Sequence, residues 1–221
     1  MTYLLHIDTS GDIGTIAISG DGAILCSTST QETRNHASAI NNMIAAMAAE
    51  AGITLHQLSA VAVCAGPGSY TGLRIGVATA KGLCYALDKP LILDNKLTLL
   101  AYTAHKAYPS LDQYVSLLVA REKEFFVTIY DDTFSCIVPP QHITEDALSP
   151  LLNKTARTYM VSDAPADTII NLELSDIKLE NNTEIDLNSW AFYSFEKYNC
   201  NLFVNLAAAE PFYLKQVYTH K

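Results

Sequence analysis

Three short apolar runs open the chain, each interrupted by turn-forming residues. Residues 3–8, 15–19 and 23–28 are rich in apolar or β-branched side chains, and a Gly-Asp-Gly triplet separates the last two runs. Such a triplet between two runs of this type is typical of a β-hairpin. We therefore expect three antiparallel strands, the first of which ends at Asp8.

The pattern then changes to helical spacing. Apolar side chains recur at intervals of three and four through residues 36–51, and Gly52 follows as a stop signal. A buried strand is expected at 60–65 and a second helix at 73–87, with Pro90 ending the unit. The first half is thus three strands, a helix, a strand and a helix.

The second half repeats this order more weakly. The expected elements are strands at 114–120, 125–131, 135–138 and 158–162, helices at 143–152 and 187–198, and a closing segment at 211–216. A repeated order of strands and helices predicts an α/β fold with two similar lobes of mixed β-sheet. We place the lobes at residues 1–105 and 106–221, because residues 104–110 are small and polar around Pro109.

The composition favours a folded protein that does not bind nucleic acid directly. Of the 221 residues, 49% are hydrophobic and 17% are charged, and the net charge is −9. Binding to a phosphate backbone requires a basic patch, so any contact with RNA should be indirect; alternatively, the acidity only keeps the protein soluble. The first residues lack the pattern of a secretory signal, and no membrane span is expected, so we predict a cytoplasmic protein.

The residue types that carry catalysis or bind metal are scattered. The five cysteines show no C-x-x-C spacing, and no two of the six histidines stand four residues apart. A disulfide framework, a metal site and a cofactor are therefore not expected. No G-x-S-x-G nucleophile elbow is present, so we assign no catalytic residue.

The first candidate site is a glycine-rich loop that joins the predicted strand at 60–65 to the predicted helix at 73–87. Its sequence from Gly66 to Gly72, G-P-G-S-Y-T-G, precedes a helix, whose free N–H groups favour an anion. The Asp-Thr-Ser triplet that ends the first strand is suited to magnesium or phosphate. The alternative for the triplet is a hairpin turn, and a tight strand-to-helix turn is the favoured explanation of the glycine-rich loop. The possible nucleotide or anion site consists of Asp8, Thr9, Ser10, Gly66, Gly68 and Ser69.

The second candidate site is a surface on the two predicted N-terminal helices. Residues 37–49 contain no charged side chain, and the second helix carries only Arg74 and Lys81. A surface helix normally has a polar face, so this pattern predicts a partner interface. The alternative is that alanine is simply a strong helix former. The candidate interface residues are Ala39, Asn42, Met43, Ala46, Met47, Ala49, Gly72, Arg74, Gly76, Thr79, Gly82 and Tyr85.

Two motifs resemble a known family. I-D-T-S at residues 7–10 and G-P-G-S-Y-T-G-L-R-I-G-V-A-T-A-K-G-L at 66–83 are similar to the TsaB family of bacterial tRNA threonylcarbamoyladenosine biosynthesis proteins. The resemblance is weaker after the first hundred residues. Val119 stands where the family reads the acid of D-A-R, and residues 210–215 resemble its closing E-P-x-Y-L-R, with a lysine at the last position.

The resemblance implies a fold, a role and partners. The fold would be the duplicated ribonuclease H-like architecture of actin-like and Hsp70-like ATPases. The protein would be a non-catalytic subunit that pairs through its two N-lobe helices with the catalytic subunit TsaD. A TsaE-like ATPase would join the pair, and the complex would place threonylcarbamoyl on adenosine 37 of tRNA. A homodimer through the same helices is also implied, while a nucleotide-dependent ATPase, kinase or peptidase-like enzyme of the same fold is the alternative.

Overall fold

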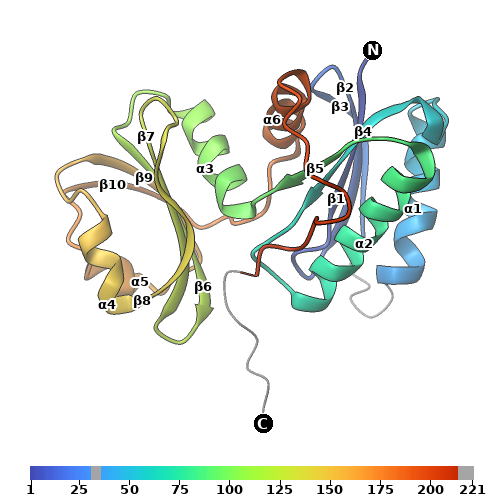
Figure 1. Cartoon of the computed structure of the whole chain (residues 1–221). Helices are drawn as coiled ribbons and strands as arrows, with labels where there is room; N and C mark the ends of the chain where they lie inside the picture. The colour runs from blue at the N-terminus through green and yellow to red at the C-terminus, as the bar shows by residue number, and fades with distance from the viewer. Residues whose placement is uncertain (31–35, 214–221) are drawn as a thin grey trace, which may run out of the picture. The chain divides into compact units, whose positions relative to one another are not determined.

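The structure is a computed structural model that describes residues 1–30 and 36–213. Within these ranges the side chains of residues 36–38 are not described. In the described residues, two five-stranded sheets carry the fold, and helices pack against both of them (Figure 1). The duplicated α/β architecture that the order of elements predicts is therefore confirmed.

The chain divides into two compact units. The first unit combines Met1–Lys96 with Leu187–Phe212, and the second contains Leu97–Asp186 together with the segment that begins at Tyr213. This division differs from the predicted boundary after residue 105. The difference arises because the last helix of the chain packs against the first sheet, so that neither unit is continuous in sequence.

The first unit contains a mixed sheet with the order β3-β2-β1-β4-β5. Its strands are β1 (Tyr3–Asp8), β2 (Gly14–Gly20), β3 (Ala23–Thr30), β4 (Leu58–Cys64) and β5 (Leu91–Asp94). The first three strands pair antiparallel, while β4 and β5 continue the sheet in parallel. Asp21 and Gly22 between β2 and β3 have positive φ, which is the backbone conformation that the predicted hairpin turn requires.

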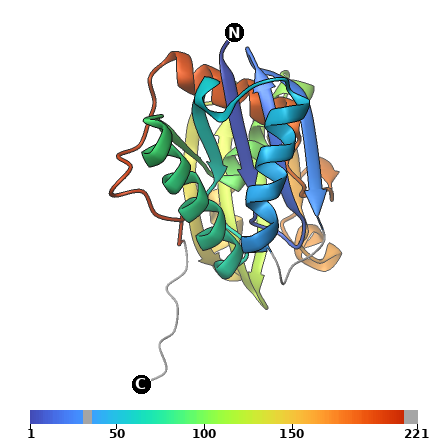
Figure 2. The same ribbon diagram turned by 90° about the vertical axis from the view of Figure 1, so that its right-hand side faces the viewer.

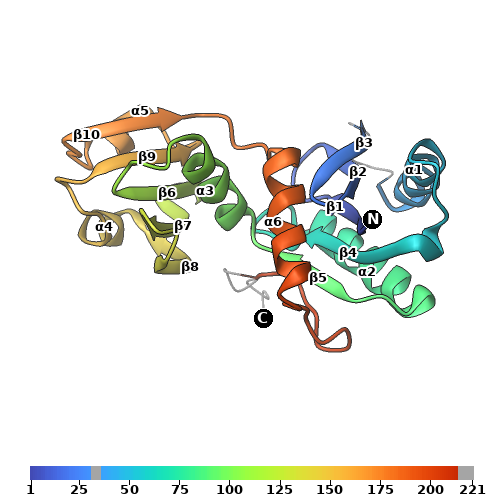
Figure 3. The ribbon, with the colours of Figure 1, turned by 90° about the horizontal axis from the view of Figure 1, so that it is seen from above.

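Helices cover both faces of the first sheet. They are α1 (His36–Glu50), the short η1 (Leu55–Gln57), α2 (Tyr70–Leu87) and α6 (Leu187–Asn199). Figure 2 shows α1 and α2 side by side in front of the sheet, and Figure 3 shows α6 on the opposite face. Alternate residues of β1 therefore face different layers. Leu5 and Ile7 join the core beneath α1 and α2, whereas His6 faces the Trp190 ring of α6.

The second unit repeats the strand order, as β10-β9-β6-β7-β8. Its strands are β6 (Gln113–Arg121), β7 (Glu124–Asp131), β8 (Cys136–Thr144), β9 (Arg157–Ser162) and β10 (Asp176–Glu180). Its helices are α3 (Lys96–Ala107), α4 (Glu145–Leu148), η2 (Ser149–Leu151) and α5 (Ala166–Ile170). The apolar side of α3 packs against aromatic residues of this sheet.

Several predicted elements of the second half are corrected by the structure. The strand predicted at 135–138 continues through Pro139 and Pro140, which is possible because β8 lies at the edge of its sheet. The helix predicted at 143–152 is reduced to α4 and η2, and β10, α3 and α5 were not predicted. In the first unit, β5 and η1 were not predicted. The closing segment predicted at 211–216 is described only as far as Tyr213, where it is not helical or extended.

A buried carboxylate joins α6 to the first sheet. The Asp94 side chain is 1% exposed, and its Oδ2 accepts hydrogen bonds from Trp190 Nε1 at 2.7 Å and Ser194 Oγ at 2.9 Å. Its Oδ1 lies 2.8 Å from Lys197 Nζ. A buried charge is tolerated when it is paired and hydrogen-bonded in this way. These contacts explain why α6 belongs to the first unit.

The segment after α6 runs back along the first unit, and we call residues 203–212 the strap. The Val204 N–H donates to the Leu91 carbonyl at 3.0 Å and pairs with the outer edge of β5. At the other end of the strap, the Phe212 N–H donates to the Ala65 carbonyl at 2.8 Å. The strap therefore covers β5, which otherwise ends the first sheet on that side.

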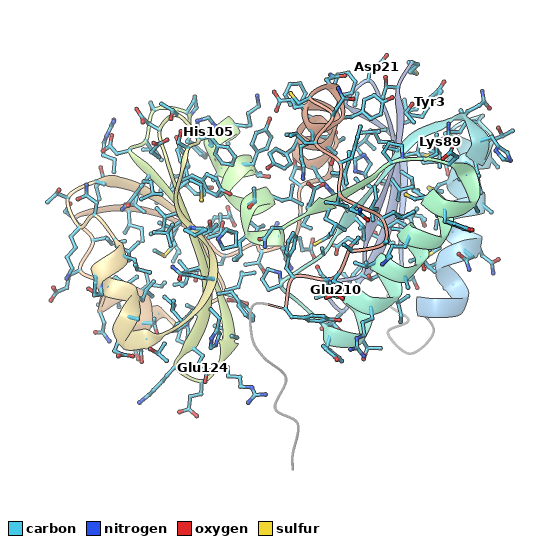
Figure 4. All side chains as sticks on the ribbon, viewed as in Figure 1. Tyr3, Asp21, Lys89, His105, Glu124 and Glu210 are labelled. Carbon is cyan, nitrogen blue, oxygen red and sulfur yellow. The ribbon has the colours of Figure 1, made fainter. Side chains whose placement is uncertain are left out.

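Lys81 of α2 fastens the middle of the strap. Its Nζ donates to the carbonyls of Ala207 at 3.3 Å and Ala209 at 2.9 Å. In Figure 4, Lys89 lies just beyond the end of α2, and Glu210 of the strap lies toward the beginning of that helix. The strap thus follows α2 back toward the glycine-rich loop.

Candidate functional site

The outer surface of α1 and α2 is poor in charge, as the sequence predicts. Of the twelve candidate interface residues, Asn42, Ala46, Ala49, Arg74, Gly82 and Tyr85 are exposed, and Ala39, Met43 and Thr79 are half-buried. We call these nine residues the helix-pair face. Tyr85 is 84% exposed, although a tyrosine ring buries much apolar area when a partner covers it. The two helices contact each other, so the nine residues belong to neighbouring elements.

Arg74 is the cation of the helix-pair face. Its guanidinium Cζ lies 4.1 Å from the centre of the Tyr70 ring, also on α2. Arginine stacked on an aromatic ring remains charged. The face includes Met43, Arg74 and Tyr85, which are of residue types that are enriched at protein interfaces.

Three candidate interface residues lie elsewhere. Met47 is buried in the core of the first unit, beneath α1. Gly72 and Gly76 are buried on the inner side of α2. The prediction was wrong for Met47 because it continues the buried stripe of Ile40 and Ile44. It was wrong for the two glycines because glycine has no side chain whose polarity indicates which side of the helix it occupies.

The inner side of α2 carries a stripe of glycines that meets the turn after β1. A Cβ on Gly72 would collide with the Thr9 carbonyl oxygen, and a Cβ on Gly68, just before the helix, would collide with the Ser10 carbonyl oxygen. A Cβ on Gly76 would collide with Thr9 Oγ1. The spacing G-x₃-G-x₃-G therefore lets the helix touch the backbone of this turn.

The same turn provides the hydrogen bonds that hold the glycine-rich loop. Thr9 Oγ1 donates to the Gly72 carbonyl at 2.7 Å, and the Ser69 N–H donates to the Ser10 carbonyl at 2.7 Å. The Ser10 N–H in turn donates to Asp8 Oδ1 at 2.8 Å. The structure thus brings the Asp-Thr-Ser triplet and the glycine-rich loop together, as the candidate anion site requires.

These contacts fit the alternative in which both segments are tight turns. Ser69 caps α2, and its Oγ accepts the Gly72 N–H at 3.3 Å. Gly66 has φ of +114°, a backbone conformation that side chains other than glycine rarely adopt. Thr9 Oγ1, Asp8 Oδ1 and Ser69 Oγ make hydrogen bonds within the chain, whereas the buried Ser10 Oγ has no hydrogen-bond partner among the described residues.

The described residues offer little other chemistry. Within residues 1–30 and 36–213, no group of three or more His, Cys, Asp or Glu side chains is placed to hold a metal ion. Burial raises the pKa of the Cys64 thiol, next to the glycine-rich loop, and keeps it in the unreactive protonated form. In the part of the chain that is described, no helix has the length and apolar character needed to cross a membrane.

The contribution of Thr9 to α2 was not foreseen from the sequence. A signal exists in the spacing of Gly68, Gly72 and Gly76, since residues four apart lie on one side of a helix. That spacing indicates a close approach of another backbone. It does not indicate which backbone, and the β1 turn is about sixty residues away in sequence.

The repeated sheet order and the helices between the strands define the class of this protein, an α/β protein with a duplicated fold of two similar sheets. The model of the TsaD family, described as tRNA N6-adenosine threonylcarbamoyltransferase, matches residues 24–208. The chain therefore belongs to the TsaD family, and it is also similar to a TsaB protein.

Two curated relatives illustrate the similarity. A tRNA N6-adenosine threonylcarbamoyltransferase from Novosphingobium aromaticivorans is 47% identical over 88 residues, which are 39% of this chain and 25% of that protein. The tRNA threonylcarbamoyladenosine biosynthesis protein TsaB from Haemophilus influenzae is 34% identical over 125 residues, which are 56% of this chain and 51% of that protein. The chain thus spans between a quarter and about half of the length of these relatives.

Solved structures support the fold. A Pseudomonas aeruginosa protein described as similar to the peptidase YeaZ superposes with a TM-score of 0.81 at 22% identity, covering 97% of this chain and 100% of that chain. YeaZ from Pseudomonas aeruginosa superposes with a TM-score of 0.77 at 21% identity, with the same coverage. At these identities the likeness concerns architecture.

Proposed function

We propose that this protein is a non-catalytic partner subunit in the synthesis of threonylcarbamoyladenosine at position 37 of tRNA. In this role it binds a TsaD-type catalytic subunit in the cytoplasm and supports its activity. The observation that carries the proposal is the charge-poor helix-pair face, which is exposed on two neighbouring helices of the first unit. The relatives named for threonylcarbamoyladenosine biosynthesis supply the reaction.

Most side chains of the helix-pair face are small and uncharged. Asn42, Ala46 and Ala49 of α1 present small, uncharged side chains, and Gly82 of α2 has open space where a Cβ would be. Small residues allow a second pair of helices to approach closely and gain dispersion contacts. A partner with a similar apolar helical surface would therefore bury these small side chains without leaving charges unpaired among them, whereas Arg74 would need an acidic group of the partner or contact with water.

The proposal extends to the remaining partners. The protein contacts tRNA only through the complex, because its net charge of −9 disfavours a phosphate backbone. A TsaE-like ATPase joins the complex, and in isolation the protein forms a homodimer through the same helix-pair face. Size-exclusion chromatography with light scattering tests the homodimer, which should dissociate when the face is changed.

Co-purification with the TsaD-type subunit of the same organism tests the main proposal. Ala46→Glu places a carboxylate on the exposed side of α1, where it would be buried by the partner, and should weaken the complex by at least about ten-fold. Ala147→Glu makes the same change on exposed α4 of the second unit and should leave binding unchanged. Equal binding of both variants and the wild type would exclude this face.

The alternative, a nucleotide-dependent enzyme of the same fold, is addressed by activity measurements on the purified protein. We expect no turnover of ATP and no cleavage of peptides, because Thr9 Oγ1 and the backbone groups of Ser10 and Ser69 are engaged in hydrogen bonds within the β1 turn and the glycine-rich loop. An activity that disappears in Asp8→Ala would contradict the proposal of a non-catalytic subunit.

A further inference from the structure

Thr9 lies against α2 on the side away from the helix-pair face. It is 2% exposed and contacts the positions of Gly72 and Gly76. On a helix with 3.6 residues per turn, these glycines stand opposite Arg74 and Tyr85, which are exposed. We propose that Thr9 is a positioning residue for the helix-pair face, an inference that rests on the function proposed above.

The contact between Thr9 and α2 leaves no free space. The Thr9 carbonyl oxygen occupies the place where a Cβ of Gly72 would be, and Thr9 Oγ1 occupies the place of a Cβ of Gly76. Thr9 Oγ1 also donates to the Gly72 carbonyl at 2.7 Å, which fixes the helix along its axis. Because threonine is branched at Cβ, its side chain has few alternative rotamers. The height and rotation of α2 are therefore set by this residue.

This contact gives Thr9 a role other than ligand binding. Its hydroxyl was a candidate for an anion or nucleotide site, but the hydrogen of that hydroxyl is directed at the Gly72 carbonyl. The neighbouring Ser10 carbonyl accepts the Ser69 N–H, so the turn holds the start of α2 at a second point. A shift of this turn would move α2 as a rigid body and would displace the exposed side chains that a closely packed partner must match.

The first experiment compares three substitutions of Thr9. Thr9→Val keeps the shape of the side chain but puts a methyl group against the Gly72 carbonyl, and should weaken binding of the TsaD-type subunit by about ten-fold. Thr9→Ser keeps the hydroxyl and should bind within about two-fold of the wild type. Thr9→Ala removes the hydroxyl without this bulk and replaces Thr9→Val if the latter does not fold.

The second experiment uses the glycines as a matched set. Gly76→Ala should weaken binding because its Cβ meets Thr9 Oγ1, and combining it with Thr9→Ala should restore part of the lost affinity because that atom is removed. Gly72→Ala should not be rescued by Thr9→Ala, since its obstacle is the Thr9 backbone carbonyl. Gly82→Ala, with open space around its Cβ, is the control for stability.

Hydrogen exchange in the free protein separates this inference from the proposed function. In Thr9→Val the amides of α2 should exchange faster than in Thr9→Ser, whether or not a partner is present. Unchanged exchange of α2 in Thr9→Val, or wild-type binding by folded Thr9→Val where Ala46→Glu disrupts the complex, would overturn the role of Thr9. If Ala46→Glu binds normally while α2 of Thr9→Val exchanges faster, the proposed function fails and the positioning of α2 by Thr9 stands.

Discussion

The two units share a sheet but differ in the helices that cover it. Both sheets place their strands in the same order, with three antiparallel strands followed by two parallel ones. The helices between the equivalent strands have 15 and 18 residues in the first unit, α1 and α2, but only 4 and 5 residues in the second, α4 and α5. The two units therefore share the order of their strands but not the length of the helices between them. In the described residues, a long helix pair with an outer face exists only in the first unit.

The surface elements of the two units also differ in their charged residues. The α4 helix begins with Glu145 and Asp146, and the edge strand β10 carries Asp176, Lys178 and Glu180. Charged side chains of this kind prefer water and protect an exposed strand edge from other chains. In contrast, the sequence of α1 contains a single Asp, Glu, Lys or Arg residue, Glu50, at the end of the helix. The comparison explains why we place the partner on the first unit.

The largest expected effect concerns the contact between α2 and the β1 turn in the first unit. Gly72→Ala puts a methyl group against the Thr9 carbonyl oxygen and should lower the unfolding free energy by about 4 kcal/mol or more. Urea unfolding followed by the fluorescence of the single tryptophan, Trp190, measures this change in the first unit.

Gly82→Ala is the matched control for Gly72→Ala. The same substitution on the same helix meets no atom within 4 Å, and should raise the unfolding free energy by about 0.5–1 kcal/mol because alanine favours helix. If the two variants unfold at the same urea concentration, the glycine stripe is not a packing surface.

The next largest effect is the loss of stability when α6 loses its polar contacts with the first sheet. It can be compared with the effect of removing a contact between α3 and the second sheet. Asp94→Ala would leave the buried Trp190 Nε1 and Ser194 Oγ without their acceptor and the half-buried Lys197 ammonium with only the Leu93 carbonyl as acceptor among the described residues, and should cost about 3–5 kcal/mol in thermal or urea unfolding. Removing one partner of such a buried group is far more costly than losing a neutral hydrogen bond.

The α3 helix provides the comparison for Asp94→Ala. It is held mainly by apolar packing, with a neutral hydrogen bond of 2.9 Å between Thr98 and Tyr130. Tyr130→Phe should therefore cost only about 1 kcal/mol. Equal decreases in unfolding free energy for Asp94→Ala and Tyr130→Phe would show that the polar contacts of the two helices contribute equally to stability.

Much of the first unit could be predicted from sequence because its elements are long or strongly patterned. The strand at 3–8, the hairpin around Asp21 and the helix at 36–51 depend on local periodicity and turn chemistry, and all three are present. The outer residues of α1 followed from the same periodicity, since the side opposite a buried stripe must be exposed.

The missed parts depend on contacts between distant segments. The four residues of β5 and the five of β10 are too short for a periodic signal, and their strand character comes from pairing with β4 and β9. The assignment of α6 to the first sheet depends on Asp94, about a hundred residues away. Gly72 and Gly76 were placed outside for the same reason, because only the β1 turn shows which side of α2 they occupy.

A smaller effect is expected when the pH is lowered, and it should arise in the first unit. His6 is 0% exposed, and burial lowers its pKa to about 4 from an ordinary value of 6.5, although the Asp94 carboxylate partly opposes the shift. The unfolded chain therefore takes up a proton at higher pH than the folded one. Stability from neutral His6 is complete above pH 6.5 and is lost as the pH falls toward 4, by about 3 kcal/mol in total.

Urea unfolding at pH 7 and pH 4.5, followed by Trp190 fluorescence, measures this dependence. His6→Gln cannot take up the proton, so the difference in unfolding free energy between the two pH values should shrink by most of that amount. In the second unit His142 pairs with Glu124 at a partly exposed site, and His142→Gln should leave the Trp190 transition unchanged. An unaltered pH dependence in His6→Gln would contradict the assignment to His6.

The smallest effect concerns the sheet edges, which the two units protect differently. The outer edge of β5 is covered by the strap through Val204, whereas β10 is a short edge strand with alternating charges. Lys81→Met removes the ammonium that donates to the Ala207 and Ala209 carbonyls, and should lower the local stability of the strap by about 1 kcal/mol.

Hydrogen exchange measured by mass spectrometry resolves this local change. Peptides covering residues 203–212 should exchange about five-fold faster in Lys81→Met, because 1 kcal/mol corresponds to that ratio, while peptides of β9 in the second unit should be unchanged. Lys89→Met removes the same charge just beyond the end of α2, outside the strap, and is the matched control. Equal exchange in the two variants would mean that Val204 and Phe212, at the two ends of the strap, hold it without help from Lys81.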